Sequence, residues 1–154
     1  MLFLLFQLGT DRYAIEASRV VEVLPLLALK RLPQAPKGVA GLFNYRGRPV
    51  PAVDLCELAL GAPARERLST RIIVLNYADA NGGDHLLGLV AENATETIRR
   101  EPAEFVESGV NVGGAPYLGP ILMEPKGPIQ WLNERRLLSA PVRDLLLKTS
   151  DVPA

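Results

Sequence analysis

The chain has 154 residues, enough for one domain with a substantial core, because folding at this size buries roughly 70% of the unfolded surface. A content of 48% hydrophobic and 22% charged residues excludes a disordered chain, and 13 prolines with 13 glycines favour a β-rich fold with many turns over long helices. The 17 basic residues balance the 17 acidic ones, which excludes a strong overall field for nucleic acid or an anionic membrane.

The opening run "MLFLLFQL" is too short for the apolar region of a signal peptide, and no basic residue precedes it, so it predicts a buried first strand. No apolar stretch reaches the roughly 18 to 20 residues that cross a bilayer. The single cysteine, Cys56, excludes an internal disulfide and fits a reducing compartment. We therefore expect a soluble, cytoplasmic protein.

The first half of the chain predicts two hairpins and one strand between them. Leu2 to Leu8, the turn "GTD" and the run "RYAI" form the first hairpin, and "SRVVEVLPL" continues as a strand before Pro25. The run "GLFNYRGRPVPAVDL" predicts a second hairpin, from Val39–Tyr45 to Arg48–Val53, which turns at Arg46 and Gly47.

The second half predicts further strands around one short helix. Asp54 lies three residues before a glutamate and caps a helix that ends at Gly61. After the polar connector "ARERLS", two apolar strands flank the loop Asn81-Gly82-Gly83, and "ATETIRREPAEF" continues as a more polar strand. The run "YLGPILMEPKGPIQWL" predicts the last two strands.

Helical signals gather at the end of the chain. Asn133 caps "ERRLL", and Pro141 stands in the first turn of a helix whose Val142, Leu145 and Leu146 share one apolar face. Both halves contain several strands, so we expect two small barrels within a single domain over residues 1–154. We place the boundary between them near the connector at residues 62–69.

The residues that usually carry chemistry do not form a cluster. His85 is the only histidine and stands beside a glycine loop, which predicts an exposed residue, and Cys56 lies in an apolar helical turn, which predicts a small buried hydrophobe. The glycine pairs at residues 82–83 and 113–114 do not have the sequence of a phosphate loop. We expect no catalytic residue, no metal site, no cofactor and no nucleotide binding.

Glu22 and Arg46 stand out against this background. Glu22 lies in mid-strand between Val21 and Val23 and so points away from them, and Arg46 occupies a turn that can approach it. From the residues alone, the two are solvated charges or share a surface ion pair worth 0 to about 1 kcal/mol.

The run "FQLGTDRYAIEASRVVEVLPLLALKRLPQAPKGVAGLFNYRGRPVPAVDL" resembles the CheW-like domain, the adaptor of bacterial chemosensory arrays. It contains a Val-x-Glu-Val-like strand, a proline-rich connector, a Gly-x-x-Asn-x-Arg-Gly hairpin and a Val-Pro-x-x-Asp-Leu strand end. "TRIIVLNY", "LLGLVAENATETI", "YLGPIL" and "IQWLNERRLL" are similar to the second half of that domain. In this half Glu92 replaces a usual aspartate, and Ala91 and Ala94 replace commoner valines, which is typical of an accessory paralogue.

The resemblance implies two interlocked five-stranded SH3-like barrels around a shared core, and a binding protein without catalysis. Such domains link the cytoplasmic tip of a methyl-accepting chemoreceptor to a CheA-type histidine kinase. Within the resemblance, Val20, Glu22 and Arg46 fall at receptor-facing and coupling positions. We expect a groove lined by Val20, Val39 and Leu42 to accept an apolar helix face while Arg46 fixes its register. The predicted partner-binding residues are Val20, Glu22, Val39, Leu42, Asn44, Arg46 and Gly47.

Two other classes of protein remain as alternatives. A stand-alone SH3-like module for peptides or nucleic acid requires an exposed aromatic cluster or a basic stripe, but the aromatic residues are scattered through the strand patterns. An enzyme with an unrecognised site is disfavoured because no nucleophile, base or phosphate loop is clustered.

Overall fold

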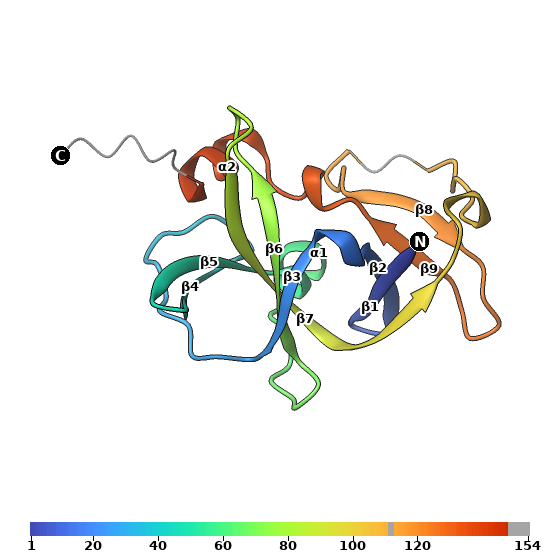
Figure 1. Cartoon of the computed structure of the whole chain (residues 1–154), viewed down its shortest axis with the longest axis horizontal. Coiled ribbons are helices and arrows are strands. Elements are labelled where there is room, and N and C mark those ends of the chain that lie inside the picture. Colours follow the sequence, from blue (N-terminus) through green and yellow to red (C-terminus); the bar gives the residue numbers. More distant parts are fainter. Residues whose placement is uncertain (111–112, 148–154) are drawn as a thin grey trace.

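The computed structural model describes residues 1–110 and 113–147. The described chain is mostly β-strand with short helices (Figure 1). The strands are β1 (Leu2–Leu8), β2 (Asp11–Glu16), β3 (Val20–Pro25), β4 (Val39–Tyr45), β5 (Arg48–Asp54), β6 (Arg71–Ala78), β7 (Asp84–Arg99), β8 (Leu118–Leu122) and β9 (Ile129–Leu132). The helices are α1 (Leu55–Leu60), α2 (Ala140–Leu146) and the short 3-10 turns η1 (Ala17–Arg19), η2 (Pro102–Glu104) and η3 (Glu134–Arg136).

The strands form two five-stranded sheets that share β7. One sheet, called the terminal sheet here, has the order β8-β9-β2-β1-β7. The other, called the internal sheet, has the order β3-β6-β7-β5-β4. Figure 1 shows β7 as a long strand that runs from the internal sheet into the terminal sheet. The expected architecture of two interlocked five-stranded units is therefore confirmed.

Strand β7 changes sheets near Asn93. Up to Ala91 it pairs with β6, and from Glu92 onward it pairs with β1. Asn93 has a φ of 49°, in the left-handed region that asparagine tolerates better than most residues, and its side-chain amide donates a hydrogen bond to Gln7. The register against β1 also shifts between Leu5 and Gln7. A local kink thus lets one strand serve two sheets.

In each sheet, a main-chain bridge links one outermost strand to the segment of chain that follows the other outermost strand. In the internal sheet, Lys30 and Leu42 exchange two hydrogen bonds of 2.8 Å, and in the terminal sheet Val106 and Ile121 do the same at 2.8 Å. Gly41 makes the first bridge possible, because a Cβ at this position would lie 2.2 Å from the carbonyl oxygen of Lys30. Each sheet therefore closes on itself, as in a small barrel.

The largest buried cluster contains residues of both sheets, among them Phe6 and Ile15 from the terminal sheet and Ile73 and Leu89 from the internal sheet. Two smaller clusters fill the separate sheets, one around Phe43 and one around Phe3, Phe105 and Ile129. The expected shared apolar core is confirmed.

Local predictions agree with the structure where they depend on neighbouring residues. The buried first strand, the hairpins and the Asp54 cap, which accepts a hydrogen bond from the Glu57 amide at 3.1 Å, are confirmed. Val142 and Leu146 of α2 pack against the shared core, but Leu145 is 54% exposed, so the prediction that it shares their buried face is wrong. At 100° per residue, Leu145 is turned away from the line that joins Val142 and Leu146.

The connector at residues 62–69 joins α1 to β6, and α1 directly follows β5, which belongs to the internal sheet together with β6. The two sheets meet within β7, because nonlocal strand pairing interleaves the two halves of the chain. The boundary near residues 62–69 stays a prediction. That residues 1–154 form a single domain stays a prediction. Within residues 1–110 and 113–147, no helix combines the length and apolar composition that a bilayer crossing requires.

Candidate partner-binding site

The β4–β5 hairpin turns where the sequence predicts. Tyr45 pairs with Arg48, and the two residues between them, Arg46 and Gly47, have φ values of 53° and 83°. Two positive φ values at the centre of a two-residue turn are typical of the type I′ hairpin, whose twist matches that of the strands. The Asn44 side chain accepts a hydrogen bond of 2.8 Å from the Gly47 amide, which fixes the turn.

The turn places an aromatic ring and a guanidinium against Glu22 of β3. The Tyr45 hydroxyl donates a hydrogen bond of 2.7 Å to Glu22 Oε1, and Arg46 Nη2 donates one of 3.2 Å to the same oxygen. The Arg46 guanidinium carbon also lies 5.3 Å from the centre of the Tyr45 ring, within cation–π range. The predicted approach of Arg46 to Glu22 is confirmed.

The Glu22–Tyr45–Arg46 cluster lies at the seam between the two outer strands of the internal sheet. Among the described strands, β3 pairs with β6 alone and β4 pairs with β5 alone. Side chains at this seam therefore join β3 to β4, together with the Lys30–Leu42 bridge. A ligand that displaces Arg46 from Glu22 would act directly on this closure.

The three side chains differ in exposure and hence in role. Tyr45 is buried at 7% exposure, while the Arg46 side chain is 76% exposed and the Glu22 side chain 38% exposed. The hydrogen bond to Glu22 raises the pKa of Tyr45, so its hydroxyl remains a donor at neutral pH. Tyr45 thus anchors Glu22, and Arg46 presents its charge to solvent from a constrained backbone.

The predicted apolar groove is not formed by the three residues expected to line it. Val20 packs against the shared core, and Leu42 is half-buried at the Lys30 bridge. Val39 lines two cavities, of about 260 and 210 Å³, and neither includes Val20 or Leu42. The partner-binding role of these residues stays a prediction.

Sequence reasoning missed two features of this region. Tyr45 was not among the predicted site residues, although its place before the turn arginine is the available signal. Val21 and Val23 are 46% and 37% exposed, so β3 carries an apolar outer face on the opposite side of the strand from Glu22. The alternation of β3 predicts this face, since residues that flank an inward side chain point outward.

His85 corrects another expectation. It is half-buried, and its Nε2 lies 2.6 Å from Asp79 Oδ2, so the prediction of a plainly exposed residue is wrong. Asp79 also accepts hydrogen bonds from the Asn81 and Gly83 amides, and the His85 contact is the main cause that lowers the pKa of Asp79. The Asp79 carboxylate accepts the hydrogen bonds of the loop between β6 and β7, and His85, the second residue of β7, lies next to that carboxylate.

Cys56 is buried as expected, and burial raises its pKa to about 11, which keeps it a thiol at neutral pH. Among the residues that the structure describes, no group of three histidine, cysteine or acidic side chains is placed to hold a metal ion.

Comparison with known proteins assigns the chain to a family. The CheW-like domain profile matches residues 2–142, so the chain belongs to the CheW-like domain family. Over 98 residues it is 31% identical to "Chemotaxis protein CheW" of Helicobacter pylori, and over 100 residues it is 30% identical to "Protein FrzA" of Myxococcus xanthus. These matches cover 63% and 65% of this chain and 56% and 59% of the relatives, so the chain matches little more than half of their length.

A solved structure supports the fold. The scaffolding protein TtCheW from Thermoanaerobacter tengcongensis superimposes with a TM-score of 0.77 over 92% of this chain and 89% of its own, at 19% identity. At such low sequence identity, the similarity shows a shared fold, that is, the same arrangement of the two sheets.

Proposed function

We propose that this chain is a non-enzymatic adaptor that couples a methyl-accepting chemoreceptor to a CheA-type histidine kinase in the cytoplasm. The observation that carries the proposal is the family match over residues 2–142, and relatives named for chemotaxis support it. The family match favours an adaptor over a stand-alone SH3-like peptide module, the alternative that the sequence left open.

In this proposal, the Glu22–Tyr45–Arg46 cluster is a receptor contact of the adaptor. A receptor tip is a helical hairpin, and the exposed Val21 and Val23 offer an apolar surface for one of its faces. Arg46, held beside Glu22 with its side chain 76% exposed, supplies a planar, charged donor for a carboxylate or carbonyl on the receptor. Because Glu22 already orients the guanidinium, binding costs little side-chain ordering.

Coupling also requires a second surface for the kinase, so that one adaptor holds both partners at once. The long β7 fixes the terminal sheet relative to the internal sheet, so contacts on the two sheets would keep a constant geometry. A movement of the bound receptor would then be passed to the kinase, because the two sheets that bind them keep fixed positions relative to each other.

The test is reconstitution with a CheA-type histidine kinase and a chemoreceptor fragment from the same organism. We expect the purified chain to bring both into one complex in gel filtration and to change the rate of kinase autophosphorylation. The same mixture without the chain is the control. Failure to bind either protein, with the chain shown to be folded by circular dichroism, would overturn the proposal.

A further inference from the structure

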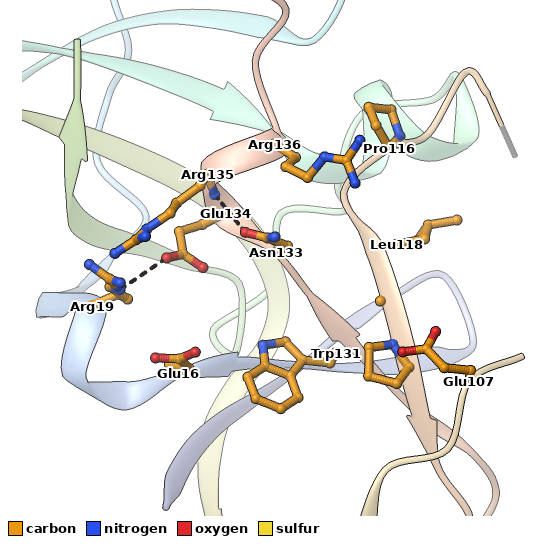
Figure 2. Close-up of a pocket in the computed structure, with 12 residues that line it drawn as sticks. Glu16, Arg19, Glu107, Pro116, Leu118, Trp131, Asn133, Glu134, Arg135 and Arg136 are labelled. Carbon is orange, nitrogen blue, oxygen red and sulfur yellow. Dashed lines mark hydrogen bonds and ion pairs between the residues drawn. The ribbon is translucent and has the colours of Figure 1, made fainter. Parts of the chain in front are cut away.

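A cavity of about 430 Å³ lies on the terminal sheet, away from the Glu22–Tyr45–Arg46 cluster. Figure 2 shows the side chains around it, which come from the end of β2, η1, the segment after η2, β8 and the residues before it, β9, and η3. Its volume falls within the range of ligand sites, and several of its lining residues are exposed, so it is open to a side chain of another molecule.

The charges that line the cavity are divided between two sides. Arg19, Arg135 and Arg136 lie around η3, whereas Glu16 and Glu107 flank Trp131 (Figure 2). Among the described residues, neither Arg135 nor Arg136 forms an ion pair, and neither Glu16 nor Glu107 does. These four side chains therefore keep their charges available to a ligand.

Glu134 does not add to the acidic side, because it has a partner of its own. Its side chain is 6% exposed and lies 3.2 Å from Arg19 Nε. This pair neutralises itself at the boundary between the cavity and the neighbouring one that Arg143 lines. The charged side chains that remain available to a ligand are two arginines on one side of the cavity and two glutamates on the other.

Trp131 forms an aromatic platform on the acidic side of the cavity, between Glu16 and Glu107 (Figure 2). Its ring packs edge-on against Phe3, with centroids 4.8 Å apart, and against Phe105 at 5.1 Å. Both phenylalanines are buried, so they hold the indole in a fixed orientation while it remains part of the cavity wall. A cation held between Glu16 and Glu107 would lie beside this ring, where cation–π attraction adds to the ion pairs.

From this arrangement we propose that the cavity binds a segment of a partner protein that carries one basic and one acidic side chain. The basic side chain lies against Trp131 and pairs with Glu16 or Glu107, and the acidic side chain pairs with Arg135 or Arg136. One turn of helix places two side chains about 5 to 6 Å apart on the same face, so a helical segment can present both charges to one cavity. The proposal does not depend on the adaptor function.

Trp131 gives a direct measurement, because it is the only tryptophan in the chain. Blocked peptides with the core Glu-Ala-Ala-Ala-Arg are titrated into the full chain at low salt, and the tryptophan emission is followed. We expect a saturable change with the mixed-charge peptide, weakened by added salt. The peptide with both charges replaced, Gln-Ala-Ala-Ala-Gln, should give no saturable change.

Variants identify the site. The double variants Arg135→Gln/Arg136→Gln and Glu16→Gln/Glu107→Gln remove the available charges of one side each without a large change in shape, and each should weaken peptide binding by about fivefold or more. Arg48→Gln, an exposed arginine in the other sheet, is the matched control and should bind like the parent. Circular dichroism and thermal melting check that all three variants are folded.

Three results would overturn the proposal: no saturable change, equal binding of the neutral peptide, or parent-like binding by both cavity variants. A peptide with the acidic side chain alone that binds as tightly as the mixed peptide would also overturn it, because the cavity would then be a simple anion site. None of these results bears on the reconstitution with kinase and receptor.

Discussion

Arg46 has a φ of 53°, a conformation that most residues with a Cβ avoid, yet its side chain bonds to Glu22. A glycine or asparagine would suit the turn better, so the arginine is retained at a conformational cost. Strain of this kind is typical of positions whose side chain has a function. This makes Arg46 the first residue to test.

Replacing Arg46 by Ala should weaken binding of a receptor fragment by about 1 to 3 kcal/mol, because a charged hydrogen bond is lost. The free energy of unfolding should change by less than about 1 kcal/mol. Arg46→Asn should lose binding equally while fitting the turn, and Arg46→Lys should restore binding only in part, since an ammonium lacks the planar fork.

The measurements are calorimetric affinity and the urea midpoint of each variant. Arg48→Ala serves as the control, because Arg48 begins the returning strand and should matter less. If Arg46→Asn binds like the parent, or loses binding only by unfolding, the turn arginine is merely a solvated charge.

Glu92 shows how a departure from the family pattern is accommodated inside the fold. Its side chain is 5% exposed and accepts hydrogen bonds from the Arg65 amide at 2.7 Å and from Arg65 Nη2 at 3.0 Å. Ala91 and Ala94 are buried on either side of it. These three departures lie in the interior, where they change packing rather than an exposed surface.

Glu92 should make stability depend on acid. Burial alone would raise the pKa of Glu92, but the hydrogen bonds and charge of Arg65 outweigh it and lower the pKa. A lowered folded-state pKa stabilises the fold above the unfolded value of about 4.3, and this contribution is lost as pH falls through the folded value. As the pH falls below about 4.3, the urea midpoint of the parent should therefore decrease more steeply than the urea midpoint of Glu92→Gln. Parallel curves would contradict this assignment.

At the scale of elements, the hairpins were predictable because each depends on adjacent residues and on turn chemistry, as at Arg46 and Gly47. The closure of each sheet was not predictable, because Lys30 and Val106 meet partners in other elements through single bridges. The predicted site also has one part that follows from adjacent residues and one part that depends on distant contacts. The Glu22–Arg46 contact follows from strand alternation and a turn, whereas the cavities that Val39 lines depend on how the sheet curls.

Gly41→Ala tests the closure of the internal sheet. The added Cβ would lie 2.2 Å from the Lys30 carbonyl oxygen, so the bridge must open or the backbone must shift. We expect the free energy of unfolding to fall by about 1 to 3 kcal/mol, as for other overpacked sites. Gly127→Ala is the matched control, because its φ of 115° is also positive but nothing lies within 4 Å of a Cβ there. Equal urea midpoints for the two variants would show that the bridge contributes little.

For the molecule as a whole, the shared strand β7 and the shared core predict one cooperative unit. Unfolding followed by Trp131 emission, which reports on the terminal sheet, should coincide with unfolding followed by far-ultraviolet circular dichroism. Gly41→Ala lies in the internal sheet, yet it should shift the Trp131 transition by the same amount as the dichroism transition. Two separate midpoints would show that the sheets unfold independently.

The interleaving of the sheets also determines what a protease can release. The internal sheet uses a continuous stretch of chain, but the terminal sheet needs strands from both ends. A nick in the exposed turn at residues 80–83 cuts the chain between β6 and β7, yet eight residue pairs still hold these strands together, and β1 and β2 still pair with β7 and β9. The cleaved protein should therefore run as two fragments on a denaturing gel and elute as one particle from a sizing column.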